Sequence, residues 1–177
     1  MDKLSRDRAV EAVNILNDFV GDCVASVNIF IDYRQFAEKQ SKQNVLITVH
    51  RVCMSYLVIT LDKWLEFYDR YNRYLPADLH DECKKLSKEL RSRNLEEFRN
   101  TCIGHIWDKK QNRPLYNSEI MARLNTITNN DLNKFLLWVN NPKNNVYPNT
   151  VVSIVETVRD RLIKDYNVDY DNEILVK

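Results

Sequence analysis

In residues 41–74 the chain reads SKQNVLITVHRVCMSYLVITLDKWLEFYDRYNRY. Apolar side chains recur in this stretch every three or four positions, which is the spacing that gathers side chains on one face of an α-helix. The stripe consists of Leu46, Val49, Cys53, Tyr56, Leu57, Thr60, Trp64, Phe67, Tyr68 and Tyr71. We therefore expect a long helix that begins at a Ser41 cap and buries one face.

The chain before this stretch repeats the pattern. Residues 4–39 carry apolar side chains at the same spacing, which predicts a first long helix capped by Ser5. Gly21 is expected to loosen or kink this helix, at about 1 kcal/mol relative to alanine. Residues 29–31 widen the apolar stripe, so the helix should contact neighbours on two sides, one of which could be a second subunit.

Shorter helices are expected after the second long helix, which ends before Pro76 because proline disfavours helical geometry in the preceding residue. They begin near Asp78, Asn94, Asn117, Asn129 and Thr150. With 177 residues, two Gly and four Pro, the chain suits one domain of helices joined by few tight turns. We predict an all-α, single-domain helical bundle over residues 1–177, in which residues 167–177 form a tail.

The composition is typical of a soluble globular protein, with 44% hydrophobic and 29% charged residues. No apolar run approaches the ~18–20 residues of a membrane span, and the acidic, polar N-terminus does not resemble a signal peptide. We therefore expect a cytoplasmic protein without a membrane partner. The four cysteines each fall on a predicted apolar helix face, which favours small buried thiols in a reducing compartment.

Several kinds of site are excluded by missing motifs. Neither glycine lies in a Gly-rich phosphate loop, and the chain contains no Glu-x-x-His, His-Glu-x-x-His or Gly-x-Ser-x-Gly pattern. His50 lacks a carboxylate or cysteine at ligand spacing, and His80 with Cys83 lacks a second ligand pair for zinc. We expect no metal and no cofactor, which leaves acid–base chemistry by side chains.

Positive charge gathers in one segment although the net charge is only +1. Residues 84–113 carry nine Lys or Arg against four Asp or Glu, whereas the segments on either side are slightly acidic. Such an excess attracts a polyanion. Alternatively, it forms a solvated helix face that is balanced by acidic neighbours in space.

Within this segment, residues 94–107 read NLEEFRNTCIGHIW and predict one short helix. Asn94 and Glu97 fit a capping box at its N-terminus. The buried stripe would consist of Leu95, Phe98, Cys102 and Ile106. Arg99 and His105 fall on either margin of that stripe, so both side chains should lie at the edge of the buried face.

The segment from Arg99 to His105 resembles the R-x(4–6)-H motif of the HEPN superfamily. Asn100 follows the arginine, and five residues separate Arg99 from His105. Gly104 supplies the small residue that this family tends to place before the histidine. The resemblance covers about residues 41–140 and is greatest to the abortive-infection and toxin branch. It implies a HEPN-like bundle acting as a homodimeric, metal-independent endoribonuclease of a toxin–antitoxin or phage-defence system, with RNA as substrate and an antitoxin or regulatory protein as a further partner.

These residue types suit the cleavage of a phosphodiester. His105 can move protons at neutral pH, Arg99 matches the phosphate oxygens, and Asn100 can orient either group. One helix would separate Arg99 from His105 by about 9 Å along its axis and about 120° around it, so one copy makes an incomplete site and a two-fold mate completes it. The expected RNA-binding residues are Arg93, Lys109, Lys110 and Arg113, and the polar loop after Trp107 could fold over a bound strand.

Two other interpretations remain open on the sequence. In the first, a HEPN-like module has lost catalysis and binds a protein or nucleotide partner. In the second, Arg99 and His105 are edge residues paired with carboxylates such as Asp108, in a helical interaction protein unrelated to the family.

Overall fold

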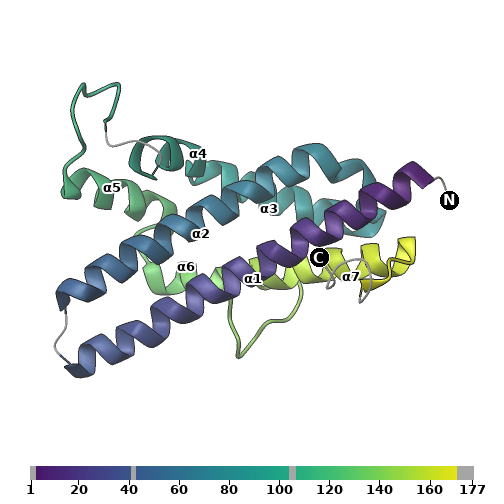
Figure 1. Ribbon diagram of the computed structural model, residues 1–177, viewed down its shortest axis with the longest axis horizontal. Helices are drawn as coiled ribbons and strands as arrows, with labels where there is room; N and C mark the ends of the chain where they lie inside the picture. The colour runs from purple at the N-terminus through teal and green to yellow at the C-terminus, as the bar shows by residue number, and fades with distance from the viewer. Residues whose placement is uncertain (1–2, 41–42, 104–106, 171–177) are drawn as a thin grey trace.

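The computed structural model describes residues 3–40, 43–103 and 107–170, and these form a bundle of helices (Figure 1). Within these ranges there is no strand beyond a single isolated bridge. The helices are α1 (Lys3–Gln40), α2 (Gln43–Tyr71), α3 (His80–Ser92), α4 (Leu95–Phe98), α5 (Asn117–Thr128), α6 (Leu132–Val139) and α7 (Val151–Tyr166). A π-helical turn at Arg99–Ile103 follows α4, and 3-10 turns occupy Asn72–Tyr74 and Ala77–Leu79. The predicted all-α bundle with two long N-terminal helices is confirmed.

The two long helices form an antiparallel hairpin, and α7 packs along α1 (Figure 1). The helix α1 runs without a break through Gly21, where a loosening or kink was expected. Gly21 lies on the exposed side of α1, where the helix needs no close approach of a neighbour. Trp64 of α2 is fully buried and contacts Phe19 of α1 and Phe67, with ring centroids 6.1 and 5.5 Å away.

The segment Val45–Tyr74, which covers most of α2, is long and apolar enough to cross a membrane by length and composition alone. The expectation that no such segment exists is therefore wrong by this measure. Core helices of soluble proteins satisfy the same criterion, and Met54, Leu57, Val58 and Leu61 of α2 are buried against the rest of the bundle. As evidence for a membrane span, this one helix is weak.

Local sequence explains where the last helix begins. The Thr150 hydroxyl accepts the Ser153 amide at 3.0 Å, and the Ser153 hydroxyl accepts the Thr150 amide at 3.1 Å, which is a reciprocal cap. Behind this cap the side chains of Val155, Val158 and Leu162 are completely buried. The helix predicted from Thr150 to about Tyr166 is confirmed.

Three of the four cysteines are buried, as their positions on apolar faces predict. Cys23 lies in α1, Cys53 in α2 and Cys83 in α3, while Cys102 in the π-helical turn is only half-buried. Burial raises the pKa of Cys83 to about 12, which keeps this thiol protonated and unreactive at neutral pH.

Candidate functional site

The chain around Arg99 is more irregular than the single helix predicted for residues 94–107. Asn94 has left-handed backbone dihedrals (φ 56°, ψ 37°), which asparagine tolerates better than most residues, and its side chain makes no capping bond. Asn94 therefore separates α3 from the single turn of α4. The prediction of a capping box at Asn94 and of one helix to Trp107 is wrong.

The candidate catalytic residues are only partly described. Arg99 and Asn100 begin the π-helical turn, whereas Gly104, His105 and Ile106 lie outside the described residues. Of the predicted buried stripe, Leu95 and Phe98 are buried and Cys102 is half-buried. The separation expected between Arg99 and His105 on one α-helix is not tested, because His105 lies outside the described residues.

Arg99 is held by a carboxylate from α2. Its guanidinium forms an ion pair with Asp62, and its Nε donates to Asn100 Oδ1 at 3.2 Å. The Asp62 side chain is 8% exposed and the Arg99 side chain 42% exposed. Burial raises the pKa of the Asp62 carboxyl, and the Arg99 charge opposes that shift. Arg99 is thus held by its ion pair with Asp62, while much of its side chain remains open to solvent.

Arg99 opens onto a groove of about 640 Å³ between α2 and the α3–α4 segment. Five carboxylates line this groove: Asp62, Glu66, Asp69, Glu96 and Glu97. Four of them are paired: Asp62 with Arg99, Glu66 with Arg70 at 2.8 Å, Asp69 with Arg91 at 2.6 Å, and Glu97 with Lys110 at 3.1 Å. Three arginines of the lining and Lys110 thus face five carboxylates, so the groove carries a net negative charge.

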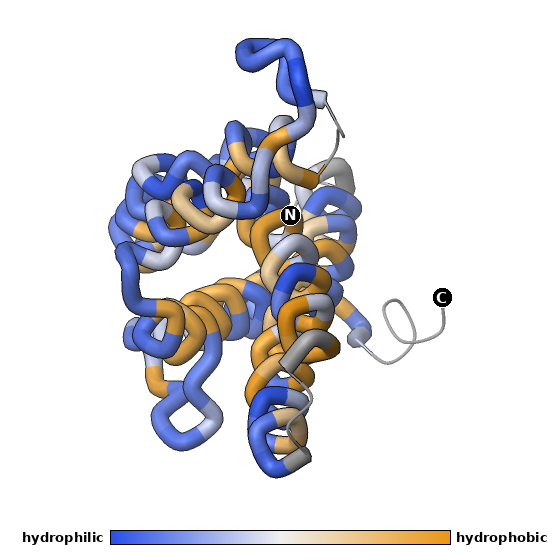
Figure 2. The backbone as a smooth tube through the Cα atoms, turned by 90° about the vertical axis from the view of Figure 1, so that its left-hand side faces the viewer, coloured by the Kyte–Doolittle hydropathy of each residue, from blue (hydrophilic) through white to orange (hydrophobic). Residues whose placement is uncertain are grey.

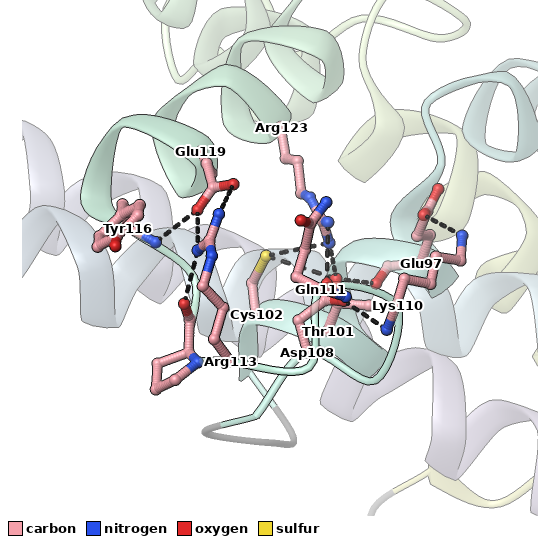
Figure 3. A network of polar contacts seen from close by, with 11 residues as sticks. Glu97, Thr101, Cys102, Asp108, Lys110, Gln111, Arg113, Tyr116, Glu119 and Arg123 are labelled. Carbon is pink, nitrogen blue, oxygen red and sulfur yellow. Dashed lines mark hydrogen bonds and ion pairs between the residues drawn. The ribbon is translucent and has the colours of Figure 1, made fainter.

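A second polar network ties the loop after the π-helical turn to α5 (Figure 3). Asp108 is fully buried; its carboxylate accepts the amides of Lys110 and Gln111 at 2.8 and 2.9 Å and pairs with Arg123 at 3.1 Å. Arg123 also donates to the Thr101 hydroxyl. The Gln111 amide is the main cause of the lowered pKa of Asp108. Asp108 therefore pairs with Arg123, and not with Arg99 as the edge-residue interpretation suggested.

Sequence reasoning missed Arg123 and the role of Asp108 as an organiser of this loop. An aspartate whose side chain binds amides two and three residues ahead is a common turn device, so its position before Lys109 was a usable signal. Arg123 carried no such signal, because only the folded chain brings α5 to Asp108.

The far end of the loop is fixed by a second carboxylate. Glu119 in the first turn of α5 accepts two bonds from the Arg113 guanidinium, both at 2.8 Å, and the Tyr116 amide at 2.7 Å (Figure 3). The Arg113 bond is the main reason that the pKa of Glu119 falls to about 2. The two ion pairs therefore hold both ends of the loop against α5.

The expected RNA-binding residues fall into two groups. Arg93 is buried: its guanidinium donates to the Ile127 carbonyl, pairs with Glu89 at 2.6 Å and lies 4.5 Å from the centroid of the Trp138 ring. We correct this assignment, because a guanidinium enclosed by protein partners cannot meet a phosphate. The other three residues, Lys109, Lys110 and Arg113, lie together in the loop before α5.

The two described histidines make structural contacts. His50 is half-buried with its ring 5.1 Å from Phe30, and burial lowers its pKa. His80 Nε2 lies 3.1 Å from the Leu75 carbonyl oxygen. Among the residues that the structure describes, no group of three or more His, Cys, Asp or Glu could hold a metal ion.

Comparison with known proteins found a solved structure with a similar fold. No protein-family model matches the sequence, and no curated protein matches it. The integron cassette protein Vpc_cass2, from the mobile metagenome of V. paracholerae, is similar in structure with a TM-score of 0.74. The two chains are 22% identical, and the match covers 88% of this chain and 96% of the cassette protein. They share a fold. At this identity the likeness carries no statement about function.

The lowered pKa of Glu119 predicts a loss of stability in acid. Because Arg113 stabilises the ionised carboxylate in the folded chain, the contribution of Glu119 is complete above its ordinary pKa of 4.5 and is lost as the pH falls toward 2. Unfolding of the wild type and Glu119→Gln by urea at several pH values measures this contribution. The difference in unfolding free energy should shrink as the pH falls, and a difference independent of pH would contradict the assignment.

Proposed function

We propose that this protein is a metal-independent endoribonuclease of a toxin–antitoxin or phage-defence system, acting as a homodimer. The observation that supports this best is Arg99, a half-exposed guanidinium whose orientation is fixed by Asp62 and Asn100 at the edge of an open groove. It lies at the start of a π-helical turn. This element is rare in proteins as a whole, but where it occurs it is often at a functional site.

In this proposal Arg99 and His105 share the chemistry of RNA cleavage. His105 takes the proton of a ribose 2′-hydroxyl, and the 2′-oxygen attacks the neighbouring phosphorus. The bond from phosphorus to the 5′-oxygen breaks, and His105 of the partner subunit gives that oxygen a proton. Arg99 donates to the phosphate oxygens as negative charge grows on them. The products are a 2′,3′-cyclic phosphate and a 5′-hydroxyl.

The experiment that tests the proposal compares the wild type with an Arg99→Ala/His105→Ala variant on RNA in EDTA. Removal of one transition-state donor commonly lowers the rate by about 10²–10³-fold, so the double variant should show at least that loss. The wild-type products should end in 2′,3′-cyclic phosphate. Equal cleavage by both proteins would indicate a contaminating nuclease and, like inactivity of the wild type, would contradict the proposal.

An apolar surface near Arg99 suits the proposed dimer. Exposed apolar side chains of α2, chiefly Val52 at 60% and Tyr56, line a mainly apolar groove of about 460 Å³. Its opposite wall includes Phe98, which directly precedes Arg99, and Ile103, the last residue of the π-helical turn. A second copy seated there would bring a second Arg99 close to the first, as a composite site requires.

A charge placed in this groove should separate the two copies. Val52→Glu puts a carboxylate among apolar side chains, which opposes burial of this surface in a dimer. Light scattering should give twice 21.1 kDa for the wild type and 21.1 kDa for the variant. The matched control is Leu137→Glu, at an exposed apolar residue of α6, which should remain dimeric. A strictly monomeric wild type would refute the dimer and leave half a site.

The net charge of the groove favours a second candidate function. Five carboxylates against three arginines and Lys110 repel phosphate more than they attract it. A HEPN-like module without catalysis, whose groove binds a basic segment of a protein partner, fits that charge better. Inactivity of the wild type in the RNA assay, with tight binding to a Lys- and Arg-rich peptide that salt weakens, would favour this module.

A further inference from the structure

The loop from Trp107 to Tyr116 projects from the bundle above α5 (Figures 1 and 2). Each end of the loop carries an aromatic ring that faces solvent, Trp107 with 51% and Tyr116 with 65% of its surface exposed. Neither residue contributes to the hydrophobic core. Both large rings are therefore available for contact with a ligand.

Hydrogen bonds and an ion pair brace the loop, although it projects from the bundle. Asp108 and Arg113 form an antiparallel bridge, with the Asp108 amide donating to the Arg113 carbonyl at 3.0 Å. Between them, Asn112 adopts a left-handed backbone (φ 51°) and accepts the Trp107 indole N–H at 3.4 Å. The buried Asp108 carboxylate anchors this turn to Arg123. The indole is thus held at its N–H, and about half of the residue's surface remains exposed.

The second ring is fixed in a similar way. The Arg113 guanidinium lies 4.3 Å from the centroid of the Tyr116 ring and is itself held by Glu119. The Tyr116 amide donates to the same Glu119 carboxylate. Arg113 covers one face of the ring, so the large exposed area of Tyr116 lies on the rest of it. Rings that are already ordered lose little conformational entropy when a ligand binds.

In the sequence, three cationic residues lie between the two rings, and one of them links the loop to the segment of the proposed nuclease site. Lys109 and Lys110 are exposed, and Arg113 precedes Tyr116 by three residues. Lys110 pairs with Glu97 at 3.1 Å, which joins the loop to α4 two residues before Arg99. Glu97 and Arg99 line the same groove. Lys109, Lys110 and Arg113 therefore place positive charge along the loop between the two rings, next to the segment that carries Arg99.

We propose that Trp107 and Tyr116 stack unpaired bases of a single-stranded RNA, while Lys109 and Lys110 contact its phosphates. Exposed aromatic rings interleaved with cations are the usual platform for single strands, because every base offers a face for stacking. A duplex keeps its bases stacked on one another and cannot use the rings. The choice of RNA over DNA rests on the proposed function, but the binding geometry is tested without cleavage.

The test measures binding of a fluorescein-labelled RNA of about 12 nucleotides with 2′-O-methyl ribose, which cannot be cleaved through its 2′-oxygen. Fluorescence anisotropy gives the dissociation constant for the single strand, for the same strand in a duplex and for single-stranded DNA. The variants are Trp107→Ala, Tyr116→Ala and both together. Trp107→Phe and Tyr116→Phe keep a ring at each position, and Leu137→Ala is the exposed control on α6.

We expect each alanine variant to weaken single-strand binding about tenfold and the pair about a hundredfold, while both phenylalanine variants stay within about threefold of the wild type. Binding should quench the tryptophan fluorescence of the wild type, and Trp107→Phe should lose that quenching without losing affinity. The duplex should bind at least about tenfold more weakly than the single strand. Tighter binding of DNA than of RNA would support stacking and count against the choice of RNA.

Equal affinity for duplex and single strand, or an unchanged affinity in the double alanine variant, would overturn the proposal, as would no binding by the wild type. If the double variant unfolds, the fluorescence of Trp107→Phe still decides the matter. Stacked binding without cleavage would refute the nuclease and keep this inference. Cleavage that is unchanged in the ring variants would keep the nuclease proposal and refute this inference. The rings would then be a surface for a protein partner.

Discussion

Replacing Trp64 with alanine should lower the free energy of unfolding by about 3–5 kcal/mol, the range for large aromatic residues removed from a core. The side chain is completely buried between α1 and α2, where it contacts Phe19 and Phe67. Its indole N–H donates to the Ser87 hydroxyl of α3 at 3.0 Å. Alanine would leave a cavity and an unpaired hydroxyl acceptor where the three helices meet.

Urea unfolding followed by circular dichroism measures this loss. The matched control is Trp107→Ala, which removes the same side chain from the exposed loop and should change the unfolding free energy by no more than about 0.5 kcal/mol. A loss below about 1 kcal/mol for Trp64→Ala would mean that Trp64 does not support the core in this way.

Replacing Arg99 with alanine should reduce RNA cleavage by about 10²–10³-fold, because the phosphate loses its only proposed guanidinium from this turn. The same change removes the partner of the Asp62 carboxylate, which is 8% exposed. We expect a destabilisation of about 1–2 kcal/mol, less than for a fully buried pair because Arg99 is 42% exposed. The pKa of Asp62 should rise further, since burial would then act on it without the opposing cation.

A double variant separates the effect on folding from the effect on chemistry. Asp62→Asn removes the uncompensated charge, so Asp62→Asn/Arg99→Ala should regain most of the stability that Arg99→Ala loses. It should not regain cleavage. Recovery of both properties would mean that Arg99 acts only through folding, and the proposed catalytic role would then be wrong.

The longer helices could be predicted from the sequence. The long helices α1 and α2 and the last helix α7 follow from apolar spacing. Such signals involve residues within a few positions of one another, so they can be recognised without knowledge of the fold. The short segment after Asn94 could not be predicted in this way, because an asparagine that fits a cap also fits a left-handed helix end.

The sequence by itself determined the all-α class, the two long helices and the position of the Arg99 motif. Only the tertiary structure decided what each cation does: Arg99 meets Asp62 from α2, Arg93 is enclosed beside Ile127 and Trp138, and Arg123 reaches Asp108. The physical reason is that helix formation depends on neighbours along the chain. The partner of a charged side chain depends instead on which helices pack together, and pairs so formed join residues 37, 34 and 15 positions apart.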